Sequence, residues 1–204
     1  ALRRCVVRPP GEPARVDFEV FEPKAEKDVP GGTVVRARAT CVACSAVLPG
    51  ERVRAQLAAQ RGGADVVFDA NGRRTGGARM IAVVTLRSRD PGRHYRLPDE
   101  LDYAAVRRAH ERVAKILDEW ERGGKQGLCP VPNEPINPVR PSPNARGLSA
   151  VTRYGMESFG DLFMARQKAT LVTLLAIVSR ISAVGACATF LSLALSRFTD
   201  IYNA

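Results

Sequence analysis

Two cysteines that could bind a metal ion lie three residues apart, in Cys41-Val42-Ala43-Cys44. Two thiolates at this spacing can hold one ion through a tight turn, but a structural tetrahedral zinc site takes four ligands. Cys5 is the nearest further candidate before the pair, and Cys129 is the nearest after it. The sequence therefore leaves open two interpretations: a zinc site built on Cys41, Cys44 and Cys5, or thiols without a metal, including the remains of a lost site.

Positive charge is concentrated in the middle of the chain. Residues 36–96 hold twelve basic against four acidic residues, which accounts for eight of the ten excess charges of the whole sequence. A local surplus of this kind is expected where a protein contacts phosphate backbones, although a solvated arginine-rich surface has the same composition. The candidate DNA-binding residues are Arg36, Arg38, Arg52, Arg54, Arg61, Arg73 and Arg74.

The sequence carries no recognisable catalytic constellation. It has two histidines, no Gly-x-Ser-x-Gly turn and no paired carboxylates in an acid-base arrangement. It also lacks the Asp/Asn-Pro-Pro-aromatic loop that holds an extruded base, and no Gly-x-Gly turn follows a strand. We therefore expect no catalytic residue in this chain.

The elements that would position the cysteines and arginines are predicted to be strands. Residues 16–20 and 33–40 alternate in polarity at the period of a half-buried strand, and the second run would place Arg36 and Arg38 on one face. The apolar run 79–86 is bounded by glycines and charged residues, which predicts a buried strand.

Helices are predicted in the second half. Asp99 and Asp102 form a helix start, and an apolar stripe then runs until Gly123-Gly124 through Tyr103, Val106, His110, Val113, Leu117 and Trp120. His110 is expected to be a hydrogen-bonded core residue. Residues 165–198 are mostly aliphatic, and we expect two buried helices joined near residues 179–182 rather than a membrane span, because Arg180 would lie in the bilayer.

These patterns predict an α+β protein with four parts. Residues 1–98 form a basic, β-rich, zinc-ribbon-like region, and residues 99–124 form an amphipathic helix. Residues 125–150 form a proline-rich connector, and residues 151–204 form a helical region. Ala1 is not an initiator residue, so we expect the chain to be an excerpt of a longer protein.

One dense motif opens the helical region. Glycines, aromatics, an acid and bases occur at fixed spacing just before an apolar helix, at Arg153, Tyr154, Gly155, Met156, Gly160, Asp161, Phe163, Arg166 and Gln167. The glycines fit turns, and Leu162 and Phe163 fit core positions. Asp161 is expected to cap a helix beginning at Leu162, with binding of a substrate group as the alternative.

With its flanking segments, this motif resembles the signature of the adenine-specific DNA methylases that contain a zinc ribbon. The resemblance spans nearly the whole chain, through Arg54 to Leu57, Met80 to Thr85, Arg93 to Pro98 and the final aliphatic helix. Two departures concern the metal: the first cysteine pair of the ribbon is absent, and Ser45 stands where the family has glycine.

The resemblance implies that the parent protein is an S-adenosylmethionine-dependent methyltransferase of a restriction-modification type. This chain would then be an accessory region that contacts DNA or supports the structure, with zinc as its own cofactor and S-adenosylmethionine bound only elsewhere in the parent. The alternative is a protein-interaction module of a multi-component defence system, with Val66, Val67 or Phe68 as anchors among the arginines. The five unevenly spaced cysteines favour a cytoplasmic setting without a membrane.

Overall fold

The computed structural model describes residues 1–36, 38–88, 90–140, 142, 147–181, 189, 191 and 194. Within this part the protein is a mixed α+β structure of small antiparallel sheets and a few helices, so the predicted class is confirmed. The strands are β1 (Leu2–Val7), β2 (Arg15–Val20), β3 (Val34–Val35), β4 (Arg38–Thr40), β5 (Val47–Leu48), β6 (Val66–Phe68), β7 (Arg74–Gly77), β8 (Val83–Arg87) and β9 (Asp90–Arg96). The α-helices are α1 (Gly50–Gln60), α2 (Glu100–Arg122) and α3 (Ala165–Ile181), and short 3-10 helices are η1 (Glu26–Asp28), η2 (Leu148–Tyr154) and η3 (Phe159–Leu162).

Strands β1 and β2 form a hairpin that Arg79 holds to the middle of the chain, and Arg8 of the hairpin also donates to the carbonyl of Ala43 at 2.9 Å. The predicted strand 16–20 is confirmed as β2, and Cys5 of β1 faces Asp17 of β2 in the register. Arg79 donates to the carbonyl of Val16 at 2.6 Å and to the carboxylate of Asp17 at 2.8 Å. This pairing, with a smaller contribution from Arg15, lowers the pKa of Asp17. One of the twelve middle cations is thus used inside the fold.

The predicted strand over residues 33–40 is wrong. The chain reverses at Arg36, whose φ is +47°, and β3 pairs back on β4 with Val35 opposite Arg38. Arg36 therefore lies in the turn and Arg38 in a strand, so the two do not share one strand face. Polarity alternates in the same way in one strand and in two strands folded together, and the turn has no glycine or asparagine to mark it.

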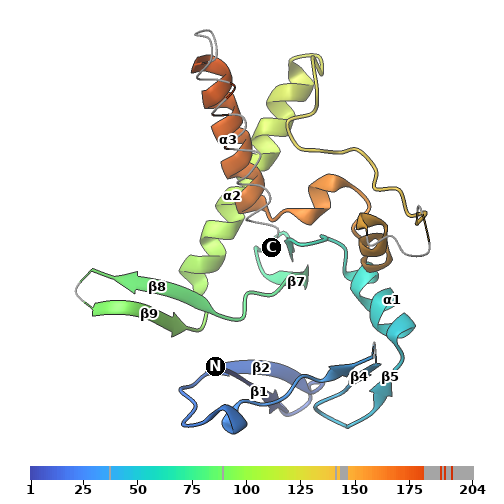
Figure 1. Ribbon diagram of the computed structural model, residues 1–204, viewed down its shortest axis with the longest axis vertical. Helices are drawn as coiled ribbons and strands as arrows, with labels where there is room; N and C mark the ends of the chain where they lie inside the picture. The colour runs from blue at the N-terminus through green and yellow to red at the C-terminus, as the bar shows by residue number, and fades with distance from the viewer. Residues whose placement is uncertain are drawn as a thin grey trace.

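The prediction that residues 79–86 form a buried strand is also wrong. Strand β8 begins only at Val83, and its sole partner in the described sheet is β9. Val84 is 53% exposed and Leu86 is 80% exposed. An unbroken apolar run indicates burial on both faces only if a second layer covers the strand, and this two-stranded ribbon projects from the body of the protein (Figure 1).

Helix α1 was not predicted, because it has no apolar stripe. It follows Pro49 and ends at Arg61, whose φ is +53°, and none of its residues is buried. Its alanines and glutamines favour a helix by intrinsic propensity alone. The helix contacts β4, β7 and η2. It therefore links the sheet that carries Cys41 and Cys44 to the second half of the chain.

The amphipathic helix is confirmed as α2. Asp99 accepts the backbone N–H of Asp102 and Asp102 accepts that of Asp99, which is the expected capping box. The predicted stripe faces inward, with Val106 buried, and Ile116 is buried as well. The helix ends at Gly123 as predicted.

Helix α3 packs beside α2 and completes the core (Figure 1). The buried apolar residues of the described chain come from β6, α2, the connector and α3, namely Val66, Val106, Ile116, Ile136, Ala165 and Val178. The helix continues through Ser179 to Ile181, and most of the predicted second helix lies outside the described residues. No helix in the described part of the chain is both long and apolar enough to cross a bilayer.

The base of the β8–β9 ribbon is fixed to the start of α2 by an ion pair, and this pair predicts a dependence of stability on pH. Arg96 donates to both carboxylate oxygens of Asp102 at 2.6 and 2.8 Å, which lowers the pKa of Asp102 to about 2. A depressed carboxyl pKa adds stability above the unfolded value of about 4, and this stability is lost as the pH falls through about 2. Asp102→Asn should therefore lower the melting temperature at pH 7, and the difference from the wild type should shrink between pH 4 and pH 2.

Thermal unfolding followed by circular dichroism across that range checks this expectation. Asp118→Asn is the matched control, because Asp118 pairs with Arg122 on the exposed side of the same helix. A difference for Asp102→Asn that stays constant from pH 7 to pH 2 contradicts the assigned ion pair.

Candidate functional site

The thiol pair lies in a tight turn between β4 and β5. The N–H of Ser45 donates to the carbonyl of Cys41 at 2.8 Å, and the N–H of Cys41 donates to the carbonyl of Ala46 at 2.9 Å. Backbone N–H groups of Ala43 and Cys44, followed by the Cys44 side chain, hydrogen-bond to the sulfur of Cys41 and lower its pKa. Ser45 adopts a left-handed backbone, with φ +60°. The turn therefore makes the thiol of Cys41 easier to deprotonate.

The described residues supply two metal ligands at this turn and not four. They contain no cluster of three or more Cys, His, Asp or Glu side chains that could hold an ion, so Cys5 does not join Cys41 and Cys44. Burial, with the carboxylate of Glu19 next in size, raises the pKa of Cys5. The donor set thus fits half of a structural zinc site.

The candidate DNA-binding arginines lie mostly on three elements, of which one helix contacts the other two. Helix α1 contacts both β4 and β7. Arg38 is on β4, Arg52 and Arg54 are on α1, Arg61 directly follows α1, and Arg74 begins β7. Only Arg73 of the seven forms a salt bridge among the described residues. In the same part of the chain, neither a salt bridge nor a side-chain hydrogen bond is formed by five of them, namely Arg36, Arg38, Arg52, Arg54 and Arg61. Four of these are exposed and Arg54 is half-buried.

The other two candidates hold the β6–β7 hairpin. Arg74 donates to the carbonyls of Ala78 and Gly77, each at 2.8 Å. Arg73 lies 3.4 Å from the carboxylate of Asp69, although its own side chain stays largely exposed. The structure therefore separates the candidate set into five arginines without a hydrogen-bonded or ionic partner and two with local contacts.

The residues of the dense motif form a joint between distant segments. Gly155 has φ +84°, and a Cβ there would lie 2.9 Å from the Cα of Ala58 in α1. Gly160 is buried and donates its N–H to the carbonyl of Pro132 at 2.7 Å, and a Cβ would lie 2.6 Å from that oxygen. These close approaches bring α1 and the proline-rich connector against the start of α3.

Asp161 does not cap a helix beginning at Leu162, so that prediction is wrong. Helix α3 begins at Ala165, and the Asp161 carboxylate instead accepts the backbone N–H groups of Glu157 and Ser158 at 2.9 and 2.8 Å. Burial opposes these hydrogen bonds, but together with Lys168 they lower the pKa of Asp161. The left-handed turn at Gly155 and the short helix η3 occupy the residues before Ala165, so α3 begins only there. The side chain of Gln167 caps the backbone N–H of Met164 at 2.9 Å.

Asp65 is the buried polar residue at the centre of the described structure, and the sequence analysis missed it. Its carboxylate accepts the N–H of Val66 at 2.9 Å and that of Ala165, the first residue of α3, at 2.8 Å. Nε2 of His110 lies 3.2 Å from the same carboxylate, yet this buried atom has no hydrogen bond of good geometry, so the prediction of a hydrogen-bonded histidine is wrong in that respect. The signal available in the sequence was an acid between Gly62-Gly63 and an apolar strand.

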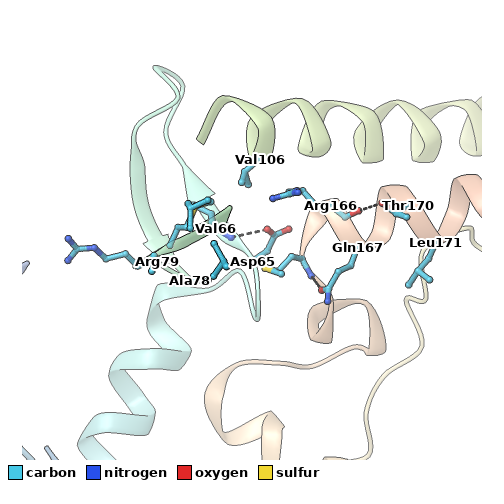
Figure 2. Close-up of a pocket in the computed structure, with 14 residues that line it drawn as sticks. Asp65, Val66, Ala78, Arg79, Val106, Arg166, Gln167, Thr170 and Leu171 are labelled. Atoms are coloured by element: carbon cyan, nitrogen blue, oxygen red, sulfur yellow. Dashed lines mark hydrogen bonds between the residues drawn. The ribbon is translucent and has the colours of Figure 1, made fainter. Parts of the chain in front are cut away.

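Two open cavities flank Asp65. One of about 540 Å³ is largely apolar and lies between β8, α2 and the start of α3. Figure 2 shows Arg166 extending toward Val106 beside this cavity, whereas Arg79 extends away from it. The other, of about 680 Å³, includes Phe68 and His110 among its lining residues. Phe68 makes edge-to-face contacts with Tyr103 and His110, and Arg107 lies over its ring, so it is not an exposed anchor.

No protein-family model matches this chain, and comparisons with curated proteins and with solved structures found no match either. The function therefore has to be argued from the residues and their arrangement.

The Asp65 junction predicts a large stability effect. Asp65→Ala removes the acceptor of the Ala165 N–H in a buried place, and an unsatisfied buried group costs about 2 kcal/mol. Asp118→Ala, which breaks an exposed pair on α2, should cost much less, because solvent screens that pair. Urea unfolding of the two variants and the wild type measures both values. Equal values for the two variants contradict the central role of Asp65.

The thiol turn predicts selective labelling. Because hydrogen bonds lower the pKa of Cys41 whereas burial raises that of Cys5, iodoacetamide should label Cys41 well before Cys5 at pH 7.5 in protein freed of metal by a chelator. Peptide mass spectrometry after timed quenching gives the two rates. The same experiment in urea is the control, because unfolding should remove the difference. Faster labelling of Cys5 in the folded protein contradicts the assigned turn.

Proposed function

We propose that this chain is an accessory, DNA-contacting region of an S-adenosylmethionine-dependent adenine-specific DNA methyltransferase. The resemblance of the dense motif and its flanking segments to the zinc-ribbon-containing methylases supports the enzyme class. The sequence holds neither the base-binding loop nor the methyl-donor turn, so the chemistry and the S-adenosylmethionine belong to other parts of the parent.

One observation carries the DNA contact. Five arginines without an ion partner lie on or beside β3, β4 and α1, namely Arg36, Arg38, Arg52, Arg54 and Arg61. An unpaired guanidinium is free to bind a phosphate, and such contacts position DNA without reading its sequence. The proposed binding is therefore tolerant of sequence and sensitive to salt.

The burial of the three residues considered as protein-interaction anchors favours the DNA proposal over that alternative. Val66 is buried, and Val67 and Phe68 are half-buried in the β6 region. Interface anchors must be available to a partner. A scaffold role in a defence system remains the alternative, and the binding experiment below separates the two.

We also propose that Cys41 and Cys44 supply two of the four ligands of a zinc ion, with the remaining ligands outside the described residues. The hydrogen bonds that make Cys41 easier to deprotonate support this, since zinc binds the deprotonated thiol. Metal analysis of the wild type and of Cys41→Ser/Cys44→Ser, both purified without chelator, tests it. Equal metal contents in the two proteins contradict the assignment.

The DNA contact predicts a specific reduction of salt dependence. Replacing Arg36, Arg38, Arg52 and Arg54 with Ala should weaken binding to a duplex of about 20 base pairs at low salt by at least tenfold. The slope of log K against log salt should fall by about 0.9 for each phosphate that the variant no longer neutralises. Fluorescence anisotropy with a labelled duplex at several salt concentrations measures both quantities.

A variant of equal net charge provides the control. Replacing Arg3, Arg15, Lys115 and Arg122 with Ala also removes four positive charges, but each of these cations is paired with a carboxylate. This variant should keep most of the affinity. Equal losses in the two variants would indicate a general charge effect, and absence of binding by the wild type would remove the DNA-contact proposal altogether.

A further inference from the structure

The β8–β9 ribbon is an exposed arm that the candidate DNA-binding set does not include. Its segment, residues 83–96, holds four arginines against one acid, Asp90. Asp90 lies 3.1 Å from Nε2 of His94, so the acid has a neighbour within the ribbon. Every described residue from Leu86 to Arg93 is exposed. The tip of the arm therefore presents a positive charge to solvent.

One face of the ribbon combines apolar, aromatic and basic side chains. Val84 lies opposite Tyr95 in the register, and directly opposite residues of an antiparallel pair share a face. Leu86 and Arg93 are the next exposed residues along the two strands, and Thr85 and His94 between them are half-buried, so both belong to the exposed side of the ribbon even though the register shifts between Thr85 and Arg87. Leu86 is 80% exposed and Tyr95 is 54% exposed. A soluble surface seldom presents such residues together without a partner.

The base of the ribbon is rigidly held. Arg96 bonds both oxygens of Asp102, lies 3.2 Å from the carboxylate of Asp99, and donates to the carbonyl of Leu97 at 3.0 Å. These contacts join the end of β9 to the capped start of α2. The direction of the arm is thus fixed by the fold, which lowers the entropy that binding has to overcome.

We propose that the β8–β9 ribbon enters the major groove of duplex DNA, with Arg87 and Arg93 at phosphates and with Leu86 and Tyr95 against base edges. The inference rests on the proposed DNA contact and adds a second contact surface to it. A two-stranded ribbon is one of the elements that fits the wide major groove of B-form DNA. Charge decides the kind of partner, because three arginines, Arg87, Arg89 and Arg93, stand against the single acid Asp90 even without Arg96, which is paired with Asp102, and DNA is a polyanion.

The shape of the major groove differs between DNA and RNA duplexes, so the two can be compared as partners of the ribbon. The major groove of an RNA duplex is deep and narrow, and side chains cannot reach its bases. Leu86 and Tyr95 should therefore contribute to binding of a DNA duplex and not to binding of an RNA duplex of the same sequence. Phosphate contacts, by contrast, are common to both.

The experiment uses the full chain and two variants, Leu86→Ser/Tyr95→Ala and Arg87→Ala/Arg93→Ala. Anisotropy titrations use DNA and RNA duplexes of about 20 base pairs at several salt concentrations. The Leu86→Ser/Tyr95→Ala variant should bind DNA at least about fivefold more weakly than the wild type. Its salt slope and its binding to RNA should be unchanged. The arginine pair should lower the salt slope on DNA by up to about two units.

Matched controls separate the arm from its surroundings. Leu128→Ala replaces a leucine that is 88% exposed elsewhere, and Arg3→Ala/Arg122→Ala removes two paired arginines. Both should bind as the wild type does, and thermal unfolding should show all variants folded. If a ribbon variant is unfolded, Leu86→Ala and Arg93→Ala are measured singly in its place.

The outcomes distinguish this inference from the proposed function. Ribbon variants that bind DNA as tightly as the wild type overturn the ribbon inference and leave the arginines of β4 and α1 as the contact. Equal losses on DNA and RNA overturn groove entry, since only backbone contacts would remain. A wild type that binds neither duplex overturns the proposed function and this inference together.

Discussion

The buried carboxylate of Asp65 is the interaction on which the second half of the structure depends. It lies at the start of β6, accepts the first N–H of α3 and faces His110 of α2. Its backbone carbonyl also accepts the N–H of Ala78 at 2.7 Å, just beyond β7. A negative charge at a helix N-terminus is favoured by the helix dipole, so the site stabilises α3 as well as satisfying its backbone. Asp65 thereby holds β6, the N-terminus of α3 and one side of α2 together.

This junction also organises the dense motif before α3. The carbonyl of Asp161 accepts the N–H of Ala64, next to Asp65, at 2.8 Å, and the Asp161 carboxylate organises the turn before α3. Gly155 and Gly160 let α1 and the connector approach the same region. The side chains of Asp161 and Gln167 in this motif are thus used in backbone contacts. Fixed spacing in a sequence can reflect such geometry as well as chemistry.

The sequence allowed prediction of those elements whose signals are local. Helix α2 has a capping box, a stripe and a terminal glycine pair, and all three were readable. Helix α1 has neither stripe nor side-chain cap, and the β3–β4 turn at Arg36 lacks the usual turn residues, so both were missed. The Asp65 contact with Ala165 spans one hundred positions, and no pattern within a window of the sequence reveals such a pair. The same limit applies to Arg79 and Asp17.

The count of arginines in residues 36–96 also does not show which of them are free to bind a ligand. Several of the middle arginines are ordered by internal contacts, as with Arg74, Arg79 and Arg96. Folding has already restricted their side-chain freedom, and their charges are compensated or turned toward carbonyls.

Arginines without a carboxylate partner keep that freedom and can adapt to phosphates at different positions, which suits binding that does not read sequence. A rigid ribbon with apolar residues near its tip has the opposite property, because its few orientations demand one groove geometry. A surface of adaptable cations around a fixed arm would therefore combine broad affinity for DNA with a defined orientation on it.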